Sequence, residues 1–236
     1  MRPEKFLRLT VATLIIIISL FTFTPVKANV DIPETNDLPV TGSADTAVVD
    51  TLSTIINASA QADEIRTQQE VEAFHNFVTS VINGKSSQVV GVYVSDVLSL
   101  PIDQQPSSDA GYITTQEDLA TQFRLAAQYG SIGILAHNFL AGEYFFELSE
   151  GMTVTIVYGD GSTADYLIKT VEEYQALSPY SPYSEFVDLD TNQRLSATDL
   201  FYHVYANENT VVLQTCIEAE GIDSWGRLFV SAELIS

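Results

Sequence analysis

Three residues in the sequence carry side chains that could act together in cysteine-based acyl transfer: Cys216, Arg227 and His137. Cys216 is the only cysteine in the chain, which excludes an intrachain disulfide and a two-cysteine metal site. A thiolate attacks a carbonyl carbon, and a neighbouring cation favours the thiolate form. Arg227 keeps its charge at any relevant pH and can donate hydrogen bonds to a developing oxyanion, while His137 can protonate a leaving amine.

The apolar patterns around these residues predict strands that bring Cys216 and Arg227 together. Alternation along 211–216 puts Cys216 on the face opposite that of Leu213, and alternation along 226–232 puts Arg227 opposite the apolar face of its own segment. If the two strands pair antiparallel, both side chains share one outer face at adjacent strand ends. The two residues are eleven positions apart, which leaves room for a strand, a loop and a second strand.

The same residues resemble those of a known family. The string Leu-Gln-Thr-Cys at 213–216, followed by Arg-Leu at 227–228, resembles the Cys strand and the Arg strand of sortases. His137, at the end of an expected strand at 132–136, sits where that family places its histidine. The resemblance extends over about 88–236 and agrees in order, spacing and strand context.

Sortases are extracytoplasmic cysteine transpeptidases, and the resemblance implies their fold. That fold is mainly β, a closed barrel of about eight strands with short helical insertions, preceded here by an N-terminal helix. It also implies Cys216 as the nucleophile, His137 as the acid/base and Arg227 as the stabiliser of charge, with Thr215 and Asn138 supporting the substrate groove. The implied reaction is cleavage of a peptide sorting signal between Thr and Gly through a Cys acyl-enzyme, with transfer to an amine.

Two other functions would use the same residues differently. A cysteine peptidase or hydrolase would release the acyl group to water, and the sequence does not encode the acceptor that would separate transfer from hydrolysis. A non-catalytic surface module with the sortase fold would bury Cys216, or would turn Arg227 and His137 away from it. Whether the three side chains converge at one exposed groove therefore discriminates between these functions.

The N-terminus predicts export. Arg2, Lys5 and Arg8 precede an apolar run at 11–23, which is followed by a small-residue cleavage site. This is the order of a secretory signal. The run has 13 residues, about 20 Å as a helix, which is short of the roughly 30 Å hydrocarbon core of a bilayer. We therefore expect a signal peptide at 1–28, or an uncleaved anchor, and a protein that is secreted or attached to the cell surface by its N-terminus.

The chain is strongly acidic. Its 31 Asp and Glu residues against 10 Lys and Arg residues give a net charge of −21. Such a charge repels phosphate backbones, which argues against nucleic acid as a partner. The expected partners are an exported protein or peptide with a sorting signal and an amine acceptor of unknown identity, and no cofactor is expected apart from a weak Ca²⁺ candidate.

Composition divides the rest of the chain into three parts. The segment 29–62 is acidic and lacks aromatic residues, and it is expected to be a flexible linker with nascent helix around 48–56. A helix is expected at 63–86 and the sortase-like catalytic domain at 87–236. The secondary structure expected within that domain is a helix at 116–129 and strands at 89–94, 132–136, 144–146, 152–158, 163–168, 211–215 and 228–234.

The linker contains a short string with two interpretations. Leu38, Pro39, Val40, Thr41 and Gly42 spell LPxTG, the signal that many sortases cut. The string lacks the hydrophobic segment and basic tail that follow a complete sorting signal. Either it is a coincidence of linker composition, or it makes an intramolecular contact in which Leu38, Pro39, Thr41 and Gly42 occupy the groove of the same chain.

The weak Ca²⁺ candidate is the triplet Asp188, Asp190 and Asn192, which is spaced like the start of a Ca²⁺ loop. Gln193 stands at the sixth position, where such a loop has Gly, and Asp199 at the twelfth, where it has Glu. A complete EF-hand is therefore not expected. A looser Ca²⁺ site on this acidic chain is the alternative.

Overall fold

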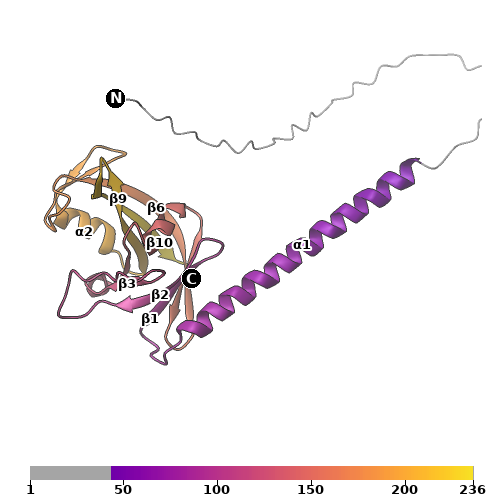
Figure 1. Ribbon diagram of the computed structural model, residues 1–236, viewed down its shortest axis with the longest axis horizontal. Helices are drawn as coiled ribbons and strands as arrows, with labels where there is room; N and C mark the ends of the chain where they lie inside the picture. The colour runs from indigo at the N-terminus through magenta and orange to yellow at the C-terminus, as the bar shows by residue number, and fades with distance from the viewer. Residues whose placement is uncertain (1–43, 236) are drawn as a thin grey trace, which may run out of the picture. The chain divides into compact units, whose positions relative to one another are not determined.

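The computed structural model describes residues 44–235 (Figure 1). The expected signal peptide at 1–28 and the LPxTG string at 38–42 lie outside the described residues. None of the described helices is both long enough and apolar enough to cross a membrane. The chain divides into two compact units, Met1–Thr51 and Leu52–Ser236.

The first described element is the helix α1 (Ala44–Val81), which begins well before the expected helix start at 63. The flexible linker expected at 29–62 is therefore wrong over its second half. The physical reason is that no Gly or Pro interrupts the chain between Gly42 and Gly84, and Ala, Gln and Glu favour the helix. After the helix, Gly84 adopts a positive φ of 82°, a conformation that glycine adopts without strain.

The C-terminal part of α1 packs on the outside of strand β1 (Val89–Val94) through aromatic rings. The ring centroids of Phe74 and Phe77 lie 4.9 and 6.0 Å from that of Tyr93. A Cβ atom at Gly91 would lie 2.8 Å from the ring of Phe77. The absent side chain at Gly91 therefore lets Phe77 lie directly against the strand.

Eight strands close into a barrel. Their order is β10-β9-β4-β3-β2-β1-β5-β6, and β10 also pairs with β6, which closes the ring. The sheet is mixed, because β2 with β3 and β4 with β9 are parallel pairs. The bounds of the remaining seven barrel strands are β2 (Leu98–Gln104), β3 (Ala120–Phe123), β4 (Ile132–Leu135), β5 (Thr153–Tyr158), β6 (Thr163–Ala176), β9 (Thr210–Ala219) and β10 (Ile222–Leu234). The expected fold class, a mainly β closed barrel with short helical insertions, is confirmed.

Shorter elements decorate the barrel. Two short strands extend the sheet from β6, and three helical segments lie between strands. They are β7 (Phe186–Asp188), β8 (Arg194–Leu195), η1 (Ala126–Tyr129), η2 (Ala141–Glu147) and α2 (Ala197–Tyr205). Together, β7, β8 and α2 occupy the long connection between β6 and β9.

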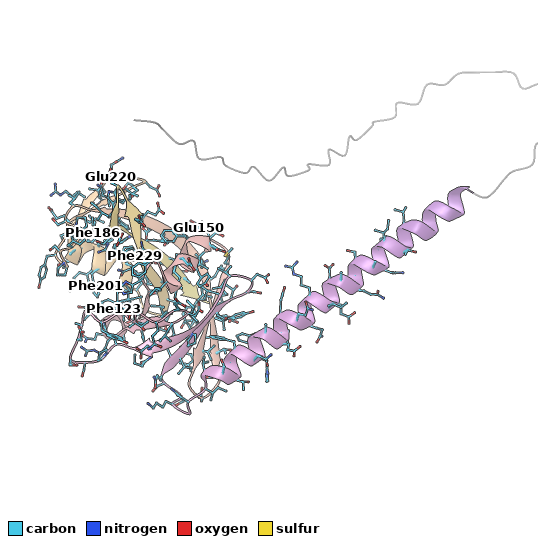
Figure 2. The ribbon with its side chains drawn as sticks, viewed as in Figure 1. Phe123, Glu150, Phe186, Phe201, Glu220 and Phe229 are labelled. Carbon is cyan, nitrogen blue, oxygen red and sulfur yellow. The ribbon has the colours of Figure 1, made fainter. Side chains whose placement is uncertain are left out.

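Two apolar clusters hold the molecule together. The first fills the barrel interior and takes side chains from all eight barrel strands, including Ile134, Leu213 and Leu228. The second lies on the outer face of β6, β9 and β10, under α2 and β7. Its aromatic members Phe186 and Phe229 lie near one another in Figure 2. The second cluster attaches the long connection to the outside of the barrel.

Two local expectations were wrong. The helix expected at 116–129 is replaced by strand β3 and the short helix η1, because Ala120 and Thr121 are fully buried and pair with β2 and β4. The strand expected at 144–146 is the helical segment η2, in which only Phe145 of the three aromatic residues is buried in the core. In both places, tertiary packing overrides local propensity.

The N-terminus of α2 generates a prediction on stability. The Ser196 hydroxyl accepts a hydrogen bond from the Asp199 amide at 3.1 Å, which caps the helix. Loss of such a cap costs about 1 kcal/mol. Urea denaturation of Ser196→Ala should therefore show a lower free energy of unfolding by about this amount. The control is Ser149→Ala, an exposed serine without a side-chain hydrogen bond in the described structure, and an equal loss in both variants would contradict the role of the cap.

Candidate active site

The β9–β10 hairpin places Cys216 directly opposite Arg227 in an antiparallel pair. The neighbouring pair, Thr215 and Leu228, faces the barrel interior, so Cys216 and Arg227 share the outer face. Directly opposite residues on one face have Cβ atoms about 4.5–5.5 Å apart. The expected antiparallel pairing of the Cys strand with the Arg strand is confirmed.

His137 follows strand β4, the parallel neighbour of β9 on its other side. The register pairs Leu135 with Gln214, and the Ala136 amide donates to the Gln214 carbonyl at 3.2 Å. Extending this register by two residues brings His137 level with Cys216. The backbone of three adjacent strands thus carries the three predicted catalytic residues to one end of the barrel.

Two predicted support residues fix the segment that carries His137. The hydroxyl of Thr215, a buried residue, donates to the Ala136 carbonyl at 3.0 Å. The Asn138 side-chain amide donates to the Asp223 carbonyl at 3.2 Å. Both bonds tie the end of β4 to the β9–β10 hairpin, one on each side of His137. Thr215 and Asn138 therefore fix the segment that carries His137 to the β9–β10 hairpin by hydrogen bonds to backbone carbonyls.

The three reactive side chains are not hydrogen-bonded to one another in the described structure. The imidazole of His137 stacks on the ring of Phe139, with centroids 5.2 Å apart and an interplanar angle of 20°. The thiol of Cys216 is free, and the residue is half-buried. The Arg227 guanidinium donates to backbone carbonyls instead. Contacts between catalytic groups often tighten only when substrate is bound.

The carbonyls that hold Arg227 come from two segments. Nη1 donates to the Ser224 and Gly226 carbonyls at 2.9 and 2.7 Å, and Nη2 donates to the Pro179 carbonyl at 3.5 Å. A guanidinium has five N–H donors. These bonds use three of them, so Nε–H and one Nη2–H have no partner among residues 44–235.

Sequence reasoning missed two residues beside the site. Gly142, in η2, donates its amide to the His137 carbonyl at 2.9 Å, and a Cβ there would lie 2.3 Å from the Thr215 hydroxyl. Trp225, in the irregular stretch before Arg227, has a buried Nε1 without a partner in the described part of the chain. Nothing in the sequence distinguishes Gly142, whereas Trp225 is the only tryptophan and lies two residues before Arg227.

A small cavity lies on the outer face beside Arg227. Its volume is about 280 Å³, and the outer-face cluster supplies most of its wall. The Tyr205 hydroxyl donates to the Gln214 side chain at 2.6 Å, and burial raises the pKa of Tyr205. The cavity is lined by Phe186, Leu200, Phe201, Phe229, Pro182 and Arg227, among others. The long connection between β6 and β9 therefore forms one wall of the cavity beside Arg227, which neither Cys216 nor His137 lines.

The weak Ca²⁺ candidate is a tight turn in the structure. The Asp188 carboxylate accepts hydrogen bonds from the amides of Asp190 and Thr191 at 2.8 and 2.9 Å. These backbone bonds, that of Thr191 above all, lower the pKa of Asp188. Asn192 has a positive φ of 59° in the same turn. Within residues 44–235, no three His, Cys, Asp or Glu side chains converge as metal ligands would.

Comparison with known proteins identifies structural neighbours only. No family model matches the chain, and no curated protein is similar to it. Sortase A of Listeria monocytogenes matches with 12% identity and a TM-score of 0.39, covering 63% of this chain and 88% of that one. A lid mutant of sortase A from Corynebacterium diphtheriae matches with 14% identity and a TM-score of 0.40, covering 72% and 93%. A Clostridium perfringens sortase D5 transpeptidase matches with 16% identity and a TM-score of 0.40, covering 72% and 95%. These neighbours belong to the family that the sequence resembles, and the likeness is one of fold alone.

The packing around Gly142 generates a prediction. In Gly142→Ala, the added methyl would overlap the Thr215 hydroxyl and the His137 carbonyl, and such overpacking costs about 1–3 kcal/mol. The free energy of unfolding, measured in urea, should fall by about this amount. Gly111→Ala is the matched control, because the nearest atom to its new methyl would be 3.6 Å away. Equal stabilities of the two variants would refute the close packing of η2 beneath the histidine segment.

Proposed function

We propose that the protein is a cysteine transpeptidase that acts outside the cytoplasm. It would cleave an exported peptide signal and transfer the acyl part to an amine. The observation that carries this proposal is the pairing of Cys216 with Arg227 on one outer face, with His137 level with them on the adjacent strand end. Export is proposed from the signal sequence at 1–28.

The proposed reaction begins at the thiol. The Cys216 thiolate attacks the carbonyl carbon of the scissile peptide bond, and the carbonyl oxygen becomes an oxyanion. When the C–N bond breaks, the leaving amine takes a proton from His137 and a thioester remains on Cys216. An acceptor amine then attacks the thioester, gives a proton to His137 and releases the Cys216 thiolate, which restores the starting thiolate and protonated histidine. Atoms and charges balance, and the product is a new amide.

Arg227 is the proposed oxyanion partner. Three hydrogen bonds to backbone carbonyls hold its guanidinium, and two donors remain available in the described structure. A fixed donor does not have to reorganise when charge develops, which is the condition for electrostatic stabilisation of a transition state. The cavity beside Arg227, with its aromatic wall, is the proposed place for a substrate side chain.

Two alternatives predict different products from the same site. A hydrolase would pass the thioester to water, so its product would be a free acid whatever amine is present. A non-catalytic module would make no thioester, and the observation in its favour is that the His137 ring stacks on Phe139 rather than bonding the thiol. The products formed with and without Cys216 separate all three functions.

The test is product analysis with the full chain. The substrate is a peptide library that includes Leu-Pro-Val-Thr-Gly, the string at 38–42 of this chain, mixed with a biotin-tagged amine. Mass spectrometry should find peptides that carry the tagged amine, and none with Cys216→Ala. Free acids alone would identify a hydrolase. Identical spectra from wild type and Cys216→Ala would refute enzymatic activity at this site.

A second prediction concerns the cation. Arg227→Lys keeps the charge but loses the planar fork of donors, and removing one oxyanion donor costs about a hundredfold or more in kcat. Turnover of a cleaved library peptide should therefore fall about a hundredfold in Arg227→Lys, with native circular dichroism retained. Arg124→Lys is the control and should keep full turnover. Arg124 bonds the Ser107 carbonyl and lies beside the start of β4, whereas His137 follows the end of that strand. Full activity of Arg227→Lys would show that turnover does not need the planar set of guanidinium donors.

A further inference from the structure

The first half of strand β2 has an open edge. On one side, β2 pairs with β1 from Leu98 to Pro101. On the other side, β3 pairs only with Ile102–Gln104. No other described strand pairs with Leu98–Leu100, so this stretch is an unpaired edge inside an otherwise closed barrel, with the Leu98 and Leu100 side chains buried. An edge of this kind can accept an additional strand.

The backbone groups of the edge point away from β1. Pro101 has no N–H, so its pair with Gly91 cannot exchange two hydrogen bonds. Bonded and non-bonded pairs alternate along an antiparallel ladder, so the pair of Ser99 with Tyr93 is also non-bonded. The N–H and C=O of Ser99 are therefore directed toward the open side, where a further strand would lie, whereas the C=O of Pro101 faces β3, whose parallel ladder begins at Ile102 and Ala120.

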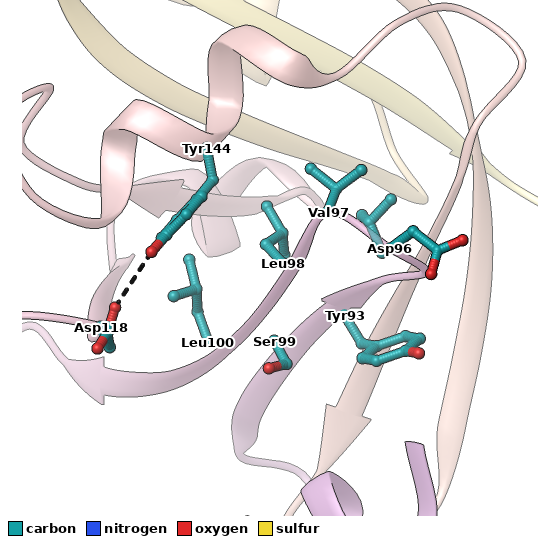
Figure 3. Close-up of a pocket in the computed structure, with 9 residues that line it drawn as sticks. Tyr93, Asp96, Val97, Leu98, Ser99, Leu100, Asp118 and Tyr144 are labelled. Atoms are coloured by element: carbon teal, nitrogen blue, oxygen red, sulfur yellow. Dashed lines mark hydrogen bonds between the residues drawn. The ribbon is translucent and has the colours of Figure 1, made fainter. Parts of the chain in front are cut away.

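A cavity of about 450 Å³ lies along this edge, within the size range of ligand sites. Figure 3 shows Leu98 and Leu100 in its middle, Asp118 and Tyr144 at one end, and Asp96 at the other end. Register places Asp118 level with Leu100, because β2 and β3 pair in parallel from Ile102 and Ala120 onward. The carboxylates of Asp96 and Asp118 thus lie at the two ends of an apolar stretch formed by Leu98 and Leu100. This stretch is about four residues, or roughly 13 Å, long.

Two carboxylates line this cavity, those of Asp96 and Asp118, and negative charge favours a cationic ligand. The Tyr144 hydroxyl donates to Asp118 at 3.5 Å, and the charge of Asp118, with burial and the charges of Glu143 and Glu147, raises the pKa of Tyr144. At the other end, the Arg66 guanidinium lies 3.6 Å from the Asp96 carboxylate. Both of those side chains are largely exposed, so the ion pair is weak and exchangeable.

We propose that the edge of β2 at Leu98–Leu100 docks an extended peptide with basic side chains. The peptide adds as a strand through the N–H and C=O of Ser99, and its Lys or Arg side chains reach Asp96 and Asp118. Charge complementarity selects this occupant, since the edge is flanked by carboxylates on a chain of net charge −21. The site uses other strands than those of Cys216 and does not rest on the proposed catalysis.

The test uses a probe peptide and the full chain carrying Cys216→Ala, which removes any turnover. The probe is capped Lys-Val-Thr-Val-Lys, whose lysines are four residues apart, as the carboxylates are. Its dissociation constant is measured by calorimetry, and amide hydrogen exchange locates it. We expect binding together with slower exchange at the Ser99 amide. The same affinity with unmutated Cys216 would show that docking is independent of the thiol.

Matched peptides separate the two parts of the proposal. Glu-Val-Thr-Val-Glu should not bind, because its charges are reversed. Lys-Val-Pro-Val-Lys should bind more weakly, because proline removes a ladder donor and the extended pairing with it. Capped single lysine should also bind more weakly than the probe. Equal binding of the proline peptide or of capped lysine would overturn strand addition, and equal binding of the glutamate peptide would overturn charge selection.

Variants of the protein complete the test. Asp96 and Asp118 both have positive φ, which asparagine tolerates, so Asp96→Asn and Asp118→Asn remove charge without straining the turns. Each should weaken the probe up to about fivefold, the size expected of an exposed ion pair. Glu150→Gln, at an exposed acid elsewhere, removes the same charge and should change nothing. Arg66→Gln should tighten binding of the probe, because it frees the Asp96 carboxylate. If the probe slows amide hydrogen exchange at 177–186 and not at Ser99, the proposed site is overturned.

Discussion

The register of β9 against its two neighbours determines the arrangement of the candidate active site. On one side it sets Cys216 opposite Arg227, and on the other it brings His137 level with both. A slip of one residue in either pairing would turn a reactive side chain into the barrel. The interior residues of β9, Val211 and Leu213, are fully buried, so the hydrophobic core itself opposes such a slip.

Packing on the outer face of the same strands also helps to determine the position of Arg227. In most small barrels the outer face meets water, but here an aromatic cluster covers part of it and holds α2 and β7 in place. The Pro179 carbonyl, from the connection that this cluster anchors, reaches the Arg227 guanidinium. The position of the arginine thus depends on packing well beyond its own strand, because the connection between β6 and β9 supplies one of its hydrogen-bond acceptors.

Much of the fold could be predicted from the sequence, because side chains alternate between the two faces of β9 and β10 and the Cys and Arg motif is local. The burial of Val212 and Phe229 on the outer face was not apparent from that alternation. Strands β1 and β5 were also predicted from β-branched runs bounded by turns, whereas the strand expected at 163–168 covers only the first part of β6, which continues to Ala176. Strand β3 was not, since its four residues become a strand only through pairing with β2 and β4. The length of α1 was missed because acidic, Ser- and Thr-rich sequence is typical of linkers as well as of exposed helix.

The candidate site is predictable in composition and less so in detail. The residue types and the motif identify the three reactive residues. Only the structure shows that backbone carbonyls hold Arg227 and that Gly142 packs against the segment that carries His137.

The buried tryptophan beside the site has a consequence for spectroscopy. Trp225 is the sole tryptophan, and its indole nitrogen is buried two residues from Arg227. Fluorescence excited selectively at tryptophan therefore arises from one position beside the site, which makes the unlabelled protein its own reporter of events there.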